Sequence, residues 1–119
     1  MDGFRFVYLL HGNGTMVADL IGNYKLPCAA TLVQVDAVAT TAAVGTVKIG
    51  TAADDDGYLP AFTFGASGTP TTADRGDFTG ALQANTAECP HLAAGDVLKI
   101  TITHASMVHP DLALTFLEG

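Results

Sequence analysis

The segment Val97-Leu98-Lys99-Ile100-Thr101-Ile102-Thr103-His104 alternates between apolar and polar side chains. In an extended chain Leu98, Ile100 and Ile102 face one side, and the lysine and threonines between them face the other. A period of two with many β-branched residues predicts a strand that buries one of its faces. This segment therefore favours a β-protein with a core on one side of the strand.

The last segment of the chain, 111–118, repeats the pattern with Leu112, Leu114 and Phe116 on one face. Pro110 precedes it, and a proline cannot donate a hydrogen bond to a central ladder. Residues 104–110 are therefore predicted to form a loop. We expect the two flanking strands to pair antiparallel and their inward side chains to form the centre of the core.

Similar short apolar runs predict further strands over residues 4–10, 15–21, 31–39, 46–50 and 59–64. Turn-forming residues separate these runs at 11–14, 22–23 and 54–57, and Gly57 is expected to take a positive φ. In the third run we expect Val33, Val35 and Ala37 to face inward. Many short strands between turns predict an all-β fold, a single antiparallel, jelly-roll-like β-sandwich over residues 1–119.

Residues 65–90 differ from the rest because they are rich in Gly, Thr, Ala and Asp and show little periodicity. Phe78 and Leu82 are the expected anchors of this segment, and residues 77–87 could form a short helix. Long loops on rigid β scaffolds often carry interaction functions. We therefore expect Arg75 and Asp77, from an Arg-Gly-Asp tripeptide, to contact a partner.

Composition points to a weakly polar surface. The chain is 49% hydrophobic and 14% charged, against about 25% charged residues in soluble domains. Either partner subunits cover much of this surface, or the chain is an ordinary Thr- and Ala-rich β-protein. The net charge is −7 and the five basic residues are scattered, which argues against nucleic acid or an anionic membrane as partner.

No segment predicts a secretory signal or a membrane span. Met1 leads into no basic and apolar signal pattern, and polar residues interrupt the weakly polar stretch 28–50. We expect synthesis in a cytoplasm, where Cys28 and Cys89 would remain unpaired and at least partly buried.

The candidate chemistries are weak. His11, His91, His104 and His109 lie in or beside predicted turns without the spacing of a metal site. Asp54, Asp55 and Asp56 are interpreted as an acidic turn, because the twelfth position of an EF-hand loop starting at Asp54 would be glycine. No nucleophile elbow, protease signature or phosphate loop is present. We expect no catalytic residue, no metal and no cofactor, and hence no enzyme.

Four segments, 27–38, 46–52, 54–59 and 92–100, together resemble small jelly-roll structural proteins of tailed bacteriophages, notably head decoration (capsid cement) proteins and related head-fibre or tail modules. The resemblance implies an oligomer, commonly a trimer, which binds the capsid protein lattice on the outer surface of the virion and bridges capsomers. Many decoration proteins have a disordered N-terminal arm, whereas strand-like sequence starts here at Phe4.

The physical features agree with that role, because repeated weak contacts supply avidity. We expect low charge, an acidic exterior and no apolar edge strand. The alternative is a carbohydrate- or receptor-binding tail or head-fibre module, which needs exposed aromatic rings. Tyr58, Phe62 and Phe64 are the nearest cluster, and tryptophan is absent. An enzyme of the cupin class is a distant third, because its ligand pattern is missing.

Overall fold

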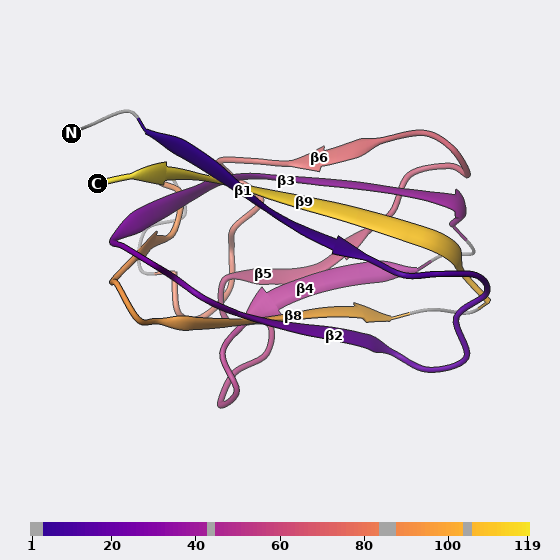
Figure 1. Cartoon of the computed structure of the whole chain (residues 1–119), viewed down its shortest axis with the longest axis horizontal. Helices are drawn as coiled ribbons and strands as arrows, with labels where there is room; N and C mark the ends of the chain where they lie inside the picture. Colours follow the sequence, from indigo (N-terminus) through magenta and orange to yellow (C-terminus); the bar gives the residue numbers. More distant parts are fainter. Residues whose placement is uncertain (1–3, 43–44, 84–87, 104–105) are drawn as a thin grey trace.

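The computed structural model describes residues 4–42, 45–83, 88–103 and 106–119. Over these residues the chain forms two antiparallel sheets packed face to face, without a helix (Figure 1). The strands are β1 (Arg5–His11), β2 (Leu20–Lys25), β3 (Ala30–Thr41), β4 (Thr46–Gly50), β5 (Leu59–Thr63), β6 (Thr71–Ala73), β7 (His91–Leu92), β8 (Val97–Thr103) and β9 (Val108–Glu118).

The strand order is that of a jelly roll. Sheet A has the order β1-β9-β3-β6, with the short β7 also paired to β3, and sheet B has the order β2-β8-β4-β5. In a jelly roll the chain folds as one long hairpin, whose first-half strands pair with its second-half strands. Apart from β7, the strand pairs follow this rule: β1–β9, β2–β8, β3–β6 and β4–β5. The predicted all-β, jelly-roll-like sandwich is confirmed.

The core lies between the two sheets, as the alternating patterns predict. Leu98, Ile100 and Ile102 enter it from β8, and Leu112, Leu114 and Phe116 enter it from β9; none is more than 2% exposed. The predicted pairing of these two strands is wrong, however. β8 pairs with β2 and β4 in sheet B, whereas β9 pairs with β1 and β3 in sheet A.

Pro110 lies inside β9, which is a central strand, and not in a loop. Its carbonyl oxygen accepts a hydrogen bond from the Gly12 N–H at 2.9 Å, just beyond the end of β1. In an antiparallel strand the N–H and C=O of one residue point the same way. The missing donor of Pro110 therefore faces the side where β1 has already ended, and the ladder with β3 is intact.

The second strand begins later than predicted. Thr15 makes only an isolated bridge with Val108, and β2 starts at Leu20. The expected turn at residues 22–23 is therefore wrong, because both lie in mid-strand. A Cβ at Gly22 would lie 3.1 Å from Leu10 Cδ1, so the glycine lies where the side chains of β1 pack closely against β2.

A bulge in β3 changes which residues face inward. The register with β9 shifts between Leu32 and Gln34, so one residue more on β3 faces the partner strand. Leu32 and Val35 are buried, and Val33 between them is only half-buried. The inward position expected for Val33 is wrong, whereas those of Val35 and Ala37 are confirmed.

The 65–90 segment is mostly irregular, as predicted, but contributes β6 to sheet A. Phe78 is fully buried and anchors it, whereas Leu82 is 44% exposed. Residues 77–83 form turns, not the helix considered for 77–87, of which residues 84–87 lie outside the described residues. No helix in the described ranges is long and apolar enough to cross a membrane.

Candidate partner-binding surface

The edge formed by β1 and β2 has an apolar exterior. Seven large apolar side chains are exposed in the part of the chain that the structure describes, and five of them fall between residues 4 and 21: Phe4, Val7, Leu9, Val17 and Ile21. Leu9 is 71% exposed and Val7 is 54% exposed. The expectation that the scaffold has no apolar edge strand is therefore wrong.

The reason lies in the sequence of β1, Arg5-Phe6-Val7-Tyr8-Leu9-Leu10-His11. Phe6, Tyr8 and Leu10 face the core, as the period of two predicts, but Val7 and Leu9 on the opposite face are apolar too. Continuous apolar runs are typical of strands covered on both faces. The sequence of β1 therefore already indicates that both faces of this strand are apolar.

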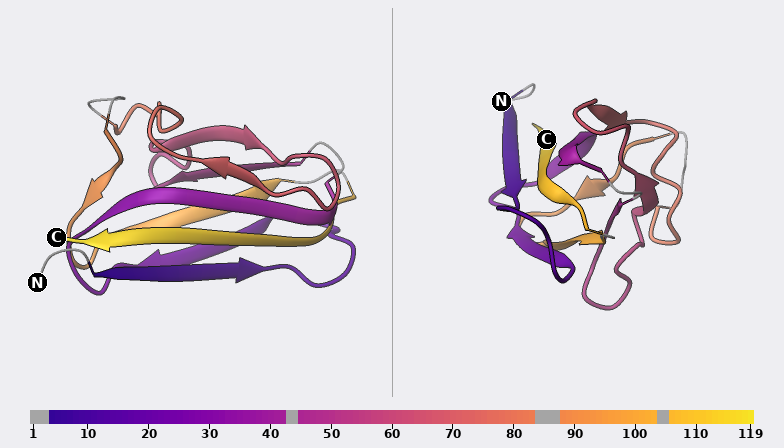
Figure 2. Two further views of the ribbon diagram at one scale, coloured as in Figure 1. Left: turned by 90° about the horizontal axis from the view of Figure 1, so that it is seen from above. Right: turned by 90° about the vertical axis from the view of Figure 1, so that its right-hand side faces the viewer.

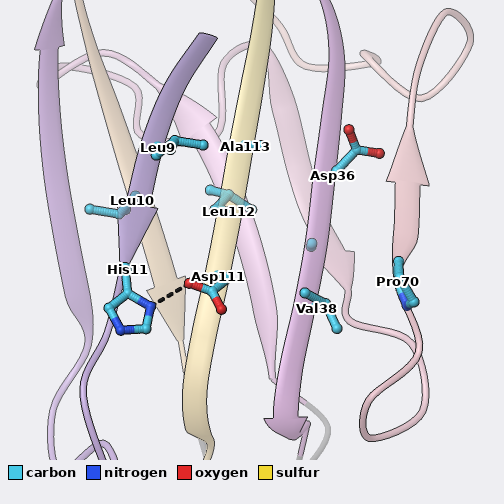
Figure 3. A pocket seen from close by; sticks show the side chains of 10 residues that line it. Leu9, Leu10, His11, Asp36, Val38, Pro70, Asp111, Leu112 and Ala113 are labelled. Atoms are coloured by element: carbon cyan, nitrogen blue, oxygen red, sulfur yellow. Dashed lines mark hydrogen bonds and ion pairs between the residues drawn. The ribbon is translucent and has the colours of Figure 1, made fainter.

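Next to Leu9 the outer face of sheet A is hollowed (Figure 3). The hollow measures about 280 Å³ and crosses β1, β9 and β3. Leu9, Val38 and Ala113 give it apolar walls. Asp36, Asp111, His11 and Pro70 also line it, together with Leu10, Ala37 and Leu112. The site therefore combines apolar surface with two carboxylates.

His11 and Asp111, opposite each other on β1 and β9, form the polar end of the hollow. The imidazole Nδ1 is bonded to the Asp111 carboxylate, and Nε2 lies 2.8 Å from the Asn13 side-chain oxygen. These two hydrogen bonds, the one with Asp111 foremost, raise the pKa of His11 above its ordinary value of 6.5. His109 stacks near the His11 ring, with centroids 6.4 Å apart.

At the other end, the side chain of Asp36 is held by two hydrogen bonds. Thr72 Oγ1 donates to one carboxylate oxygen at 2.6 Å, and Gln34 Nε2 donates to the other at 2.8 Å. The hollow thus has a hydrogen-bonded carboxylate at each end and apolar walls between them. This arrangement suits an apolar or basic side chain from another protein.

The loop residues expected to contact a partner lie elsewhere, because neither lines the hollow. Arg75 is exposed in a turn with Gly76 at φ 102°. The Asp77 carboxylate accepts a hydrogen bond from the Asp74 N–H at 3.0 Å, and the Asp77 N–H donates to the Asp74 carbonyl at 2.9 Å. Asp77 thus closes the turn that displays Arg75.

The expected aromatic cluster offers little ring surface. Tyr58 and Phe62 are half-buried and pack against the core, and Phe64 is only 4% exposed. The structure thus places Phe64 in the core instead of on the surface. None of the three rings lines the hollow.

The acidic turn at residues 54–57 is held by local bonds. The Asp54 carbonyl accepts the Gly57 N–H at 3.1 Å, and Asp55 pairs with Lys48 at 3.1 Å. A hydrogen bond with Asp56 raises the pKa of Asp54. Gly57 lacks the expected positive φ, and a Cβ there would lie 2.3 Å from Leu82 Cδ1, so a larger residue would displace the Leu82 side chain.

Within the described ranges no three His, Cys, Asp or Glu side chains are grouped as a metal site would need. His11 ends β1, His91 lies in β7 and His109 in β9, while His104 lies outside the described residues. Cys28 and Cys89 are unpaired and half-buried. Burial is the main cause that raises the pKa of both thiols.

Fold and surface together define a jelly-roll domain with an apolar outer sheet face and edge. A chain of the cyanophage Pam1 capsid asymmetric unit has a similar structure, with a TM-score of 0.57, 18% sequence identity, and coverage of 99% of this chain and 87% of that chain. At this identity the likeness is one of fold. No protein-family model and no curated protein matches the sequence.

Proposed function

We propose that this chain is a non-enzymatic structural protein of a bacteriophage virion, which decorates and stabilises the capsid as an oligomer. The observation that carries the proposal is the likeness to the Pam1 capsid chain, which spans nearly the whole of both chains. The match covers 99% of this chain and 87% of that chain, so it is not confined to a small part of either.

The surface chemistry supports an assembly role. The apolar outer face of β1 is costly in water and would be stabilised by a covering partner. Low charge and the hollow with its two carboxylates suit contacts with a mixed or basic protein surface. On a lattice, many copies of a weak contact add up to firm attachment. In this proposal the partners are the capsid protein lattice and further copies of the chain, at the outer capsid surface.

The finer features rest on the resemblance of the sequence to decoration proteins: a trimer, and a position that bridges neighbouring capsomers. The alternative, a carbohydrate- or receptor-binding tail or head-fibre module, gains little from the aromatic residues. Sugar binding relies on exposed rings, and Tyr58, Phe62 and Phe64 are half-buried or buried.

Copy number in purified virions of the phage that encodes the chain separates these functions. Quantitative mass spectrometry with isotope-labelled peptides, calibrated on the major capsid protein, should find on the order of hundreds of copies, as lattice coverage requires. A handful of copies per particle would favour the tail or fibre module. Virions that lack the protein altogether would refute both.

A further inference from the structure

Within the part of the chain that the structure describes, no strand pairs with the second edge of β1. β1 pairs with β9 on one side and lies at the end of sheet A (Figure 2). The Phe4 carbonyl accepts the Glu118 N–H at 2.7 Å, and the Gly12 N–H donates to Pro110, so even-numbered residues turn their main-chain groups toward β9. Because these groups alternate along an antiparallel strand, those of Arg5, Val7, Leu9 and His11 point away from the sheet.

This edge lacks the usual protection against pairing. Proteins shield edge strands with prolines, lysines, bulges or short length. β1 is seven residues long, keeps one register with β9 throughout, and contains neither proline nor lysine. By contrast, β5 contains Pro60 and a register shift, and β6 has three residues. The other edge strand of sheet B, β2, ends in Lys25 and has Gly22 in its interior. β1 is therefore the edge best suited to accept another strand.

We infer that β1 pairs antiparallel with β1 of a second copy of this chain, about a two-fold axis at Tyr8. This register sets Val7 opposite Leu9 of the second copy, and Arg5 opposite its His11. All the opposed residues are odd-numbered on both strands, so their outward main-chain groups meet as hydrogen-bonded pairs. The two A sheets then continue into one another as a single sheet.

The side chains are self-complementary in this register. Val7 and Leu9, the two exposed apolar residues of β1, form one apolar strip with their counterparts. Arg5 lies opposite His11 of the second copy, and the Asp111 carboxylate bonded to that imidazole offsets the positive charge there. Two arginines do not meet in this register. The half-buried rings of Phe6 and Tyr8 on the opposite face are also brought closer to a partner.

Neighbouring registers fit less well. A two-fold axis at Val7 would set Arg5 opposite Leu9 and leave His11 beyond the pairing within the strand. An axis at Leu9 would set Val7 opposite His11 and leave Arg5 without a partner in the strand. Only the axis at Tyr8 engages all four free residues. The contact is isologous and closes as a dimer. It does not depend on the proposed virion role, and it is an alternative to the trimer that the resemblance to decoration proteins implies.

Oligomeric state is the first test. Sedimentation equilibrium of the full chain should give twice the monomer mass of 12.2 kDa. Val7→Pro removes a main-chain N–H at the free edge but breaks no hydrogen bond to β9. Because that N–H would bond to the second copy, the substitution should raise the dimer dissociation constant about tenfold or more. Asn23→Pro on β2 is the matched control. The Leu26 N–H donates to the Asp96 carbonyl, so even-numbered residues of this strand turn their main-chain groups toward β8. Those of Asn23 therefore face the free edge of β2. This control substitution should leave the dimer intact.

Circular dichroism of both variants checks that each still folds. A monomer, a trimer, or a dimer that Val7→Pro leaves unchanged while folded would overturn the proposal. Should Val7→Pro fail to fold, the exposed substitution Leu9→Lys takes its place, because it adds a repelling charge at the apolar strip without touching the ladder.

Cross-linking tests the register. Val7→Cys and Leu9→Cys proteins, each with Cys28 and Cys89 replaced by serine, are mixed and oxidised. The axis at Tyr8 yields the mixed 7–9 disulfide in preference to 7–7 or 9–9, since opposed positions have the shortest Cβ separation. Predominance of 7–7 would move the axis to Val7, and predominance of 9–9 would move it to Leu9; either refutes the stated register. Absence of all three products refutes the strand pairing.

Discussion

The ring of Tyr8 stacks on the ring of Tyr24, with centroids 4.4 Å apart and planes inclined by 20°. These residues lie on β1 and β2, the edge strands of opposite sheets. Tyr24 also contacts the Phe116 ring at 5.6 Å, and Phe6 stacks on Phe116 at 5.1 Å. A chain of aromatic contacts thus closes this side of the sandwich.

The Tyr8–Tyr24 contact should be measurable as a coupling free energy. In a double-mutant cycle with Tyr8→Leu and Tyr24→Leu, urea unfolding should give a coupling of about 0.5–1.5 kcal/mol, the usual value of an aromatic pair beyond its buried area. Additive losses would mean that the two rings stabilise the fold separately and that the stack itself contributes nothing.

Ile100 should be a main support of the core. It is fully buried in the central strand β8, and Ile100→Ala should lower the free energy of unfolding by about 2–5 kcal/mol through lost burial and a residual cavity. Val97→Ala on the same strand, where the side chain is 49% exposed, should stay within about 0.5 kcal/mol. Equal effects of the two substitutions in denaturant melts would contradict the placement of the core.

Much of this architecture could be predicted from the sequence, because a half-buried strand records its burial as a period of two. The inward faces of β1, β4, β8 and β9 follow directly from that rule. Strand pairing does not, because alternation reports which face is buried and not which neighbour is bonded. β8 and β9 are adjacent in sequence, and their patterns are the same whether they pair or lie in opposite sheets.

The remaining differences have local physical causes. Pro110 is tolerated in a central strand because its missing donor faces the end of β1. Gly22 marks a close approach to Leu10 and not a turn. The outer face of β1 does not follow from the period of two, because that rule describes only the inward half of a continuous apolar run. Val7 and Leu9 make this outer face apolar as well, and both side chains are exposed.

The His11–Asp111 pair should make stability depend on pH. The pKa of His11 is raised in the fold, so the stabilisation is fully present below the unfolded value of about 6.5 and is lost as pH rises through the higher folded value. Melting temperatures followed across that range should show this loss in the native protein. In Asp111→Asn the loss should shrink, and the NMR titration of His11 should move toward lower pH; an unchanged titration would exclude the pair as its cause.

The two cysteines should behave as protected thiols. Cys28 and Cys89 are half-buried, Cys89 Sγ lies 3.8 Å from the Val33 carbonyl oxygen, and burial raises the pKa of both groups. Because the thiolate is the reactive form, thiol reagents at neutral pH should react slowly with the folded protein and fast in guanidinium. Intact mass spectrometry of fresh protein should give the fully reduced mass; a mass lower by two hydrogen atoms would reveal a disulfide.

Attachment to the capsid should depend more on the outer face of sheet A than on the Arg75 turn. Ala113→Lys places a long charged side chain over the hollow, away from the free edge of β1, and should weaken attachment about tenfold or more because it obstructs the apolar centre of the contact. Arg75→Ala removes one exposed charge and should weaken it only about two- to threefold, as expected for a residue at the rim. Asp77→Asn, which retains an acceptor for the Asp74 N–H, should behave like Arg75→Ala.

The measurement is co-sedimentation of each purified variant with virions stripped of the protein, after a melting curve has shown that the variant folds. Normal attachment of Ala113→Lys together with loss of attachment in Arg75→Ala would place the interface on the 65–90 segment. In that case the domain would still bind the capsid lattice with its hollow filled by the lysine, and the hollow would not be the contact.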